Sequence, residues 1–376
     1  MDLHLEMSDS EARIHARVSL TMRGEAFRFA LASPLKIESA RCGGRELPLP
    51  EGENCSLQYL PTDVRAYTFA GYPGAELEFE YSGALSGPLL YYRREVRHFS
   101  LYNCWYPVAF DAEAEPVDVT LPDDGEWELV QGERDAERGL WRYTTRGRTI
   151  KDCNILLLRR GEWTRLESGG VSVLYCEPSR AAAAAEEAVR QCSEIRAFYR
   201  SLYGHDGELR DLTLVYLPEG PGKAAYMRDG LVVLTIIPDD FRHLLAHELG
   251  HAHACRADFG SWEDWLNETG AEWSALLYER EVDPEGFEQR LEVLLKIAGS
   301  HSLRLRPEDG SHPDDVHETG TLLFAKICEK YGPDAVRRIL LSLDSLGRQD
   351  TAGLLAELRR RGDEELAREI EAHIDA

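Results

Sequence analysis

The periodicity of the apolar residues divides the chain into two parts, and this division constrains the fold more than any other feature. Over roughly the first 165 residues, segments such as "ARIHARVSLTM", "EAFRFALA" and "ELEFEYSG" alternate apolar and polar residues with a period of two, which is typical of half-buried β-strands. Glycine and proline separate these segments, and "VDVTLP", "WELVQG", "WRYTTRG" and "CNILLLRRG" continue the series. Short strands at this spacing predict an antiparallel β-sandwich.

The second part of the chain has a helical pattern. "SRAAAAAEEAVRQCSEIRAFYRSLYG" predicts a helix over 179–204, with Ser179 as its N-cap and Gly204 as its end. Two apolar strands follow, "DLTLVYLP" and "LVVLTIIP". The helices that we expect after them cover roughly 239–256, 262–281, 284–299, 313–331 and 333–346, followed by two short C-terminal helices. We therefore expect an α+β protein with a β domain at 1–167 and a domain of a small mixed sheet plus helices at 168–376.

Composition excludes several classes of partner. The formal net charge is −24, which argues against nucleic acid or an anionic membrane, because both attract basic surfaces. The N-terminus is polar and has neither the basic n-region nor the apolar h-region of a signal peptide. No run approaches the ~18 apolar residues of a membrane span. The 8 cysteines are scattered without CxxC spacing, which favours free thiols and a cytoplasmic location. The sequence leaves the oligomeric state open.

A possible metal site lies in "HELGH", where His247, Glu248 and His251 form an HExxH motif. On a helix the two histidines lie one turn apart on one face, which suits two ligands of a zinc ion, and Glu248 is placed to accept a proton from water. His243 extends the same face by one turn. The alternative is therefore a solvated helix face rich in histidine, in which the motif arises by chance.

The next predicted helix carries acids that could complete the site. Glu268 and Glu272 are four residues apart, so they share a face and both could point at the histidines. Glu263 and Asp264 fall in the first helical turn, where acids commonly interact with the helix dipole, so we interpret them as structural. The tryptophans of this helix are more typical of core than of a substrate contact.

Together, "HELGH" and "WLNETGAEW" resemble the gluzincin zinc peptidases of the membrane alanyl aminopeptidase and leukotriene hydrolase family. The resemblance implies one Zn²⁺ ion with Glu268 as its third ligand, and a thermolysin-like catalytic domain behind an N-terminal β domain. The additional C-terminal domains of the family have no counterpart before Ala376. Two features depart from the family pattern. Sixteen residues separate His251 from Glu268, two fewer than in the family, and Thr269 stands where the family has glycine.

Further site residues follow from the same resemblance. "AAYMRDGLVVL" occupies the place of the family's GxMEN strand, whose glutamate captures the substrate amine. Met227 matches its methionine, Arg228 replaces the glutamate and Asp229 replaces the asparagine. An arginine cannot bind an ammonium, because it is always cationic and has no acceptor. Either Asp229, Glu268 or Glu272 anchors the amine, or the enzyme needs none. The alternative is that "MRDG" is simply a tight turn.

Two other segments align with substrate-binding parts of the family. "HFSLYNCWYPVAFD" resembles a β-domain segment that reaches the active cleft, which would place Tyr102, Asn103 or Trp105 near the substrate, although such residues in a sandwich are more often core. "DDVHETGTLLFAKICEKYG" aligns His317 with the family's oxyanion-stabilising tyrosine and Gly320 with its glycine. A histidine ring N–H can donate to a developing oxyanion. Otherwise His317 only begins a helix.

These features predict a zinc-dependent peptide hydrolase, aminopeptidase-like, in which Glu248 acts as general base and then general acid. One alternative is an oligopeptidase that needs no substrate amine, as Arg228 suggests. Another is a non-catalytic, zinc-bearing scaffold protein, although a scaffold has no use for Glu248. The family also contains an epoxide hydrolase, so a peptide as the substrate is itself an expectation.

Overall fold

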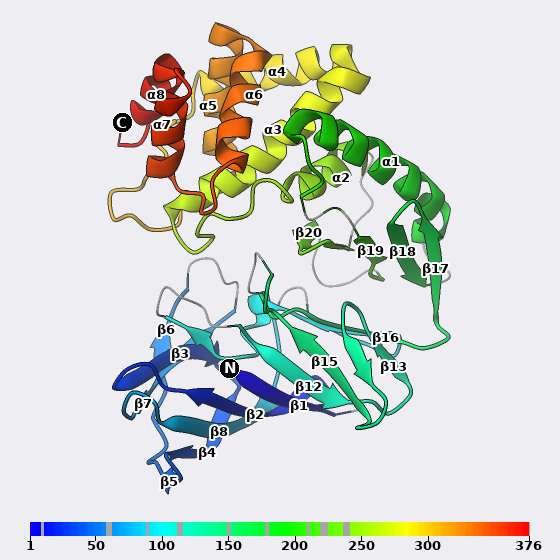
Figure 1. Cartoon of the computed structure of the whole chain (residues 1–376), viewed down its shortest axis with the longest axis vertical. Coiled ribbons are helices and arrows are strands. Elements are labelled where there is room, and N and C mark those ends of the chain that lie inside the picture. The colour runs from blue at the N-terminus through cyan, green and yellow to red at the C-terminus, as the bar shows by residue number, and fades with distance from the viewer. Residues whose placement is uncertain are drawn as a thin grey trace. The chain divides into compact units, whose positions relative to one another are not determined.

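The computed structural model describes residues 1–8, 11–57, 62–87, 90–110, 116–148, 152–176, 180–207, 209, 211–218, 225–235 and 241–375. The chain forms two compact units, mainly Met1–Thr164 for the first and Arg165–Tyr216 with Ala225–Ala376 for the second (Figure 1). Along the chain, the division between the two units falls after Thr164, three residues before the boundary expected from the sequence.

The first unit consists of β-sheets. The largest sheet has the strand order β14-β15-β12-β1-β2-β8-β4-β5. Its strands are β1 (Asp2–Met7), β2 (Arg13–Thr21), β4 (Lys36–Cys42), β5 (Arg45–Glu46), β8 (Glu76–Ala84), β12 (Asp118–Pro122), β14 (Glu133–Asp135) and β15 (Leu140–Thr144). Two smaller sheets contain β13 (Trp127–Leu129), β16 (Ile155–Arg159), β10 (Val96–Phe99) and β9 (Tyr91–Tyr92), and β11 (Val108–Ala109), β3 (Ala26–Ala32), β7 (Val64–Ala70) and β6 (Glu53–Cys55).

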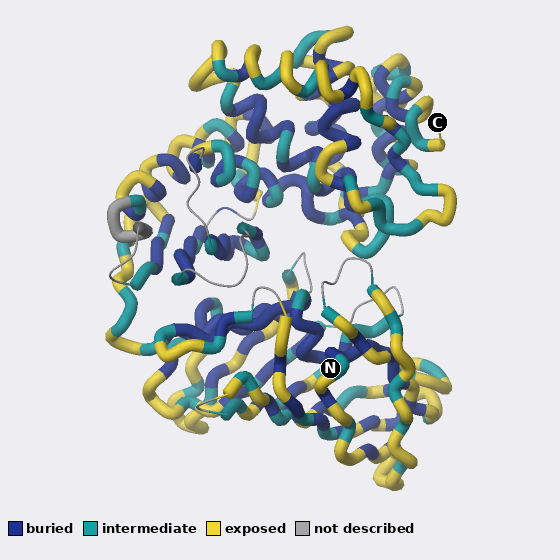
Figure 2. The backbone as a smooth tube through the Cα atoms, turned by 180° about the vertical axis from the view of Figure 1, so that it is seen from behind, coloured by how far each residue is buried: buried dark blue, intermediate teal, exposed yellow. Residues whose placement is uncertain are grey.

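The alternating pattern of the sequence becomes an alternation of buried and exposed side chains. In β8, Leu77, Phe79 and Tyr81 are buried while the glutamates between them face outward. The buried faces of the sheets share one hydrophobic core, and Figure 2 shows the buried stretches inside the unit. The expected sandwich is therefore present, but it is not wholly antiparallel, because β1 pairs in parallel with β12.

The second unit combines a small sheet with helices (Figure 1). The sheet has the order β17-β18-β19-β21-β20, formed by β17 (Trp163–Ser168), β18 (Val171–Cys176), β19 (Leu212–Tyr216), β20 (Ala225–Arg228) and β21 (Leu231–Leu234). The helices are α1 (Arg180–Tyr203), α2 (Phe241–Gly250), α3 (Trp265–Val282), α4 (Pro284–Ala298), α5 (Val316–Tyr331), α6 (Pro333–Asp344), α7 (Thr351–Arg360) and α8 (Glu364–Glu371). The sheet is mixed, since β19 is parallel to β18 and β21, and β20 is antiparallel to β21.

Most expected helices are present, and α1 ends before Gly204, which has a φ of 84°. The expected start of this helix at Ser179 lies outside the described residues. The helix expected at 239–256 was predicted too long, because α2 ends at Gly250 and a tight turn follows. Periodicity did not predict three strands of the small sheet, β17, β18 and β20, because each is short and lacks a long apolar run. Of these, β20 was expected only as the counterpart of the family's GxMEN strand.

In the second unit, helices α2 and α5 both pack closely against α3. At Gly250, an added Cβ would lie 2.8 Å from the carbonyl oxygen of Ala271, so only glycine lets α2 approach α3 this closely. At Gly320, an added Cβ would collide with Thr269 Oγ1 and lie 2.9 Å from the Trp265 ring. The two glycines therefore bring the ends of α2 and α5 against the start of α3.

All eight cysteines lie among the described residues, and none of them forms a disulfide. In the described part of the chain, we find no helix with the length and apolar character needed to cross a bilayer.

Candidate metal centre

The two histidines of the HExxH motif both direct their Nε2 atoms toward Glu268 Oε2. His247 lies in the last turn of α2, and His251 follows the helix end in a tighter turn, its N–H donating to the Glu248 carbonyl at 3.2 Å. His251 Nδ1 lies 3.1 Å from the carbonyl oxygen of Ala254, and a carbonyl can only accept. The proton of His251 is therefore on Nδ1, which leaves Nε2 free to bind a metal.

Glu272 has the corresponding role for His247. Its Oε2 lies 2.9 Å from His247 Nδ1, and its Oε1 lies 3.0 Å from His243 Nε2. A carboxylate that accepts from the distal ring nitrogen fixes both the tautomer and the orientation of a metal-binding histidine. Burial alone would lower the pKa of His243, but its hydrogen bonds to the carboxylates of Glu272 and Glu279 outweigh burial and raise the pKa to about 9. Both oxygens of Glu272 are thus engaged by histidines.

Glu268 supplies the third group of the cluster. Its Oε2 lies 3.6 Å from His247 Nε2 and 3.9 Å from His251 Nε2, and one ligand atom of each residue falls within 4.8 Å of the others. Burial would raise the pKa of Glu268, but the neighbouring histidines keep it well below the ordinary value. Two imidazoles and one carboxylate that stays ionised are the donor set of a catalytic zinc site. The residues present therefore fit zinc.

Glu248 is buried beside this cluster and differs from the other acids in its surroundings. Glu248 is only 4% exposed, and its Oε2 has no hydrogen-bond partner among the described residues. Burial raises its pKa to about 7, an effect that the charges of His247 and Arg228 oppose and that of Glu268 reinforces. A carboxyl group with a pKa near neutrality can take up and release a proton during a reaction.

His317 lies in the first turn of α5 and contacts the cluster through Glu268. Its Nδ1 lies 2.8 Å from Glu268 Oε2, and its side chain remains 65% exposed. This ion pair raises the pKa of His317, while burial acts against the shift. His317 is therefore at the cluster, and most of its side chain is exposed.

Arg228 and Asp229 lie on a hairpin next to α2. β20 packs against α2, and Asp229 and Gly230 form the turn into β21, both with positive φ (47° and 77°). The sequence alternatives of a strand and a tight turn are thus both realised. Met227 was predicted to contact the substrate, but its side chain is 1% exposed and packs in the core.

Other predicted residues have structural surroundings. Trp105 is fully buried in the first unit and donates to the Cys153 carbonyl at 2.9 Å, while Asn103 is buried and accepts from Ser100. Neither is therefore a substrate contact. Tyr102 is half-buried in the first unit, and its contact with substrate stays a prediction. Glu263 accepts from the N–H and hydroxyl of Thr351, which agrees with a structural role.

A second cluster, formed by His205, His253 and Asp344, was not predicted, because these residues are far apart in the chain. Asp344 lies 2.7 Å from His205 Nε2 and 3.1 Å from His253 Nδ1. The N–H of Gly207 donates to His205 Nδ1, so Nε2 must carry the proton and donate to Asp344. A metal at Nε2 would require the other tautomer and break this bond. We therefore interpret the cluster as a hydrogen-bond network.

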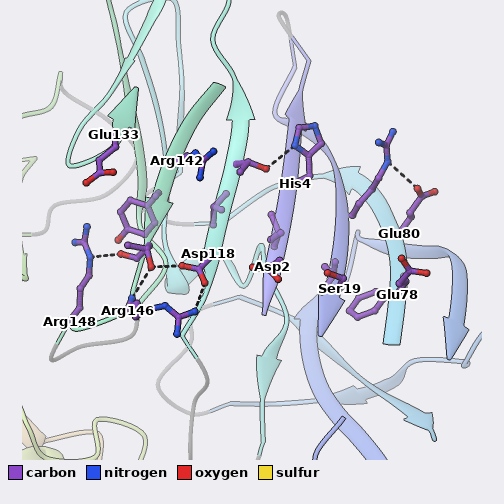
Figure 3. A pocket seen from close by; sticks show the side chains of 18 of the residues that line it. Asp2, His4, Ser19, Glu78, Glu80, Asp118, Glu133, Arg142, Arg146 and Arg148 are labelled. Carbon is purple, nitrogen blue, oxygen red and sulfur yellow. Dashed lines mark hydrogen bonds and ion pairs between the residues drawn. The ribbon is translucent and has the colours of Figure 1, made fainter. Parts of the chain in front are cut away.

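A broad hollow of about 1130 Å³ lies on the outer face of the large sheet in the first unit (Figure 3). Its side chains bind one another across neighbouring strands: Arg17 pairs with Glu80 at 3.0 Å and Arg146 with Asp118 at 2.6 Å. The hollow belongs to a different unit from the HExxH cluster, and these two ion pairs join its own side chains. It contributes no residue to the candidate metal centre.

Comparisons with known proteins give fold-level matches only. No family model matches the sequence, and no curated protein matches it significantly. Among solved structures, the fold is shared with two-domain M1 zinc metallopeptidases. The M1 zinc metallopeptidase of Deinococcus radiodurans is 16% identical with a TM-score of 0.65, over 100% of this chain and 93% of that chain. A point mutant of that protein was solved with a Tyr-Ser-Ala substrate.

The second similar protein is the native leukotriene A4 hydrolase of Saccharomyces cerevisiae. It is 12% identical with a TM-score of 0.69, over 99% of this chain and 66% of that chain. At such low identity these matches establish the shared fold, which is the α+β architecture expected from the sequence.

Proposed function

We propose that the protein is a zinc-dependent peptide hydrolase. The observation that carries the proposal is the convergence of His247, His251 and Glu268, each with a free or ionised ligand atom, beside a buried Glu248. The fold shared with M1 zinc metallopeptidases supports the same chemistry, and the Tyr-Ser-Ala bound to the Deinococcus protein supports a peptide as the class of substrate.

In the proposed mechanism, His247, His251 and Glu268 hold the metal, and Glu272 and the Ala254 carbonyl hold the two imidazoles in position. Bound there, zinc would supply the Lewis acidity that polarises a carbonyl and acidifies a water. Glu248 takes the proton of the attacking water and later delivers it to the leaving nitrogen. His317, held by Glu268, donates a ring N–H to the developing oxyanion.

The type of cleavage depends on how the substrate is held. An aminopeptidase needs a carboxylate for the substrate amine, and Glu272 is engaged by two histidines while Glu268 is a proposed ligand. Asp229, in the turn beside Arg228, is the remaining candidate for an amine anchor. The cationic Arg228 on the β20 hairpin favours the alternative, an oligopeptidase that needs no free amine. A scaffold that only binds zinc fits less well, because it would not require a buried glutamate with an unsatisfied oxygen.

The test is a digest of a defined peptide mixture followed by mass spectrometry. Zinc-loaded protein should cleave, chelator-treated protein should not, and readdition of zinc should restore cleavage. Stepwise loss of N-terminal residues would identify an aminopeptidase, and internal cuts an oligopeptidase. Absence of any cleavage by protein that carries one zinc ion would contradict the proposal.

A further inference from the structure

A cavity of about 290 Å³ lies between the helices α1, α2 and α3 of the second unit, at the start of α2 and the end of α3. Its apolar lining comes from Phe241, Ala275 and Val282. Val282 and the neighbouring Arg242 are exposed, so the cavity opens to solvent. Sites for small molecules begin at about 300 Å³, and the cavity therefore suits a ligand of the size of one amino acid.

Two buried residues of the cavity lining carry polar atoms that the described residues leave unsatisfied. Gln191 of α1 is 6% exposed, and Tyr278 of α3 is 2% exposed. Gln191 Nε2 donates to Glu187 at 2.7 Å, whereas Gln191 Oε1 and the Tyr278 hydroxyl have no hydrogen-bond partner in the described part of the chain. Buried polar groups are nearly always paired with protein, water or a ligand. The two atoms therefore indicate that a polar molecule occupies the cavity.

Charges of both signs line the same cavity. Arg242 of α2 forms no hydrogen bond or ion pair with any described residue, so its guanidinium can bind a carboxylate. Glu279 of α3 lies 2.9 Å from Arg290 and 3.5 Å from His243 Nδ1. A carboxylate has about four acceptor sites, so these two contacts leave Glu279 able to accept from an ammonium group as well. One guanidinium and one carboxylate match the two charged groups of a free amino acid.

His243 connects the cavity with the proposed metal centre. Its side chain lines the cavity, and its Nε2 lies 3.0 Å from Glu272 Oε1. The other carboxylate oxygen of Glu272 lies 2.9 Å from Nδ1 of the proposed ligand His247. A molecule that displaces His243 therefore acts on the carboxylate that orients His247.

We propose that this cavity is a second binding site, which takes a free amino acid with an apolar side chain and regulates the metal centre through His243 and Glu272. The amino acid pairs its carboxylate with Arg242 and its ammonium group with Glu279 and Gln191 Oε1, and its side chain lies against the apolar lining. Such molecules are products of peptide hydrolysis. The regulatory part of the inference rests on the proposed function, whereas binding in the cavity does not.

The experiment measures binding of L-leucine and L-leucinamide by isothermal titration calorimetry. Leucinamide keeps the ammonium group and the side chain but lacks the carboxylate. The full chain is used without zinc, because a metal ion could itself bind an amino acid. The proteins are the wild type, Arg242→Gln, Glu279→Gln and the control Arg280→Gln, which removes an exposed arginine of α3 that does not line the cavity.

We expect the wild type and Arg280→Gln to bind L-leucine with equal affinity. Arg242→Gln should weaken the binding of leucine by about 10- to 100-fold, the usual effect of a hydrogen bond between charged groups, and should leave the affinity for leucinamide unchanged. Glu279→Gln should weaken both ligands. Absence of leucine binding to the wild type, or equal affinity in the wild type and Arg242→Gln, would overturn the inference.

A second measurement tests the coupling. Saturating L-leucine should change the zinc affinity of the wild type, measured against a chromophoric chelator, by about fivefold or more. The same concentration should have little effect on Arg242→Gln. An unchanged zinc affinity in leucine-bound wild type would overturn the regulatory role. Protein that binds leucine in this way but cleaves no peptide would keep the binding site and remove the proposed hydrolysis, so the two failures are distinguishable.

Discussion

The partner of each ring nitrogen decides what a histidine at this site can do. His247 and His251 both donate from Nδ1, one to a carboxylate and the other to a carbonyl, so both keep Nε2 for a metal. Glu272 has a second hydrogen-bond partner, because its other carboxylate oxygen binds His243. We therefore expect the zinc affinity to depend on Glu272, which is not one of the proposed ligands.

The variant Glu272→Gln tests this dependence. We expect the zinc affinity to fall by about 10- to 100-fold, because an amide is a weaker acceptor for His247 Nδ1. Competition with a chromophoric chelator measures the change. Glu281→Gln, an exposed glutamate on the same helix, should leave the affinity unaltered. An unchanged affinity in Glu272→Gln would show that His247 is oriented by something else.

The sequence could predict the residues of the HExxH motif because their spacing alone puts two imidazoles on one helix face. It could also predict that Glu268 and Glu272 share a face, since they are four residues apart. It could not assign them different partners, because that depends on the distance at which α3 crosses α2. That distance is set by Gly250 against Ala271.

At the scale of elements, Thr269 and Gly320 form a complementary pair. The Thr269 side chain fills the space that a Cβ at Gly320 would need. Thr269 is 1% exposed, and Gly320 lies on the helix that carries His317. The threonine that departs from the family pattern is therefore matched by a glycine on the facing helix, so α3 and α5 still pack closely.

A double-mutant cycle tests this packing. Gly320→Ala should destabilise the protein by about 1–3 kcal/mol, because the new methyl group collides with Thr269. In the Thr269→Gly background the same change should cost much less. Urea unfolding monitored by circular dichroism provides the four free energies. Additive effects of the two substitutions would contradict direct contact between them.

The Asp344 network joins the end of α6 to the turn after α2. Burial would raise the pKa of Asp344, but hydrogen bonds from His253 and His205 lower it overall. A carboxyl group with a lowered pKa stabilises the fold above its ordinary pKa and loses that contribution as the pH falls through the folded-state value. The stabilisation by Asp344 should therefore be complete at neutral pH and disappear in acid.

Asp344→Asn should lower the free energy of unfolding at pH 7 by about 1–3 kcal/mol, because His253 then loses its charged acceptor. The difference from the wild type should shrink as the pH falls below 3.8, the ordinary pKa of the carboxyl group. Urea unfolding as a function of pH measures it. His205→Ala, at an exposed position, should cost less than Asp344→Asn, and an equal cost would argue against this distribution of the energy.

At the scale of the molecule, the chain forms two units, each with its own hydrophobic core. All three proposed ligands and Glu248 belong to the second unit. A ligand that binds only the folded state stabilises the part that forms its site. Removal of zinc should therefore raise amide hydrogen exchange in α2, α3 and α5, while the sheets of the first unit keep their protection. A comparable increase throughout β1–β16 would contradict this division.

Period-two alternation was enough to predict a β-rich first unit, because burial on one face imposes that pattern on each strand. The helical pattern that follows it was enough to predict the helices of the second unit. It could not predict which strands are neighbours, so the parallel pair of β1 and β12 was missed. Short strands such as β20 were missed for a related reason. Four residues carry too little pattern, and the pairing of β20 with β21 is what makes it a strand.

The central claim is that Glu248 moves protons at a zinc ion bound by His247, His251 and Glu268. The most direct test compares the wild type with Glu248→Gln on one cleavable peptide, with zinc measured in the same samples. We expect equal zinc content and a kcat lower by about 10²–10⁴-fold, since glutamine cannot accept the proton of water. Equal zinc content with equal turnover would contradict it.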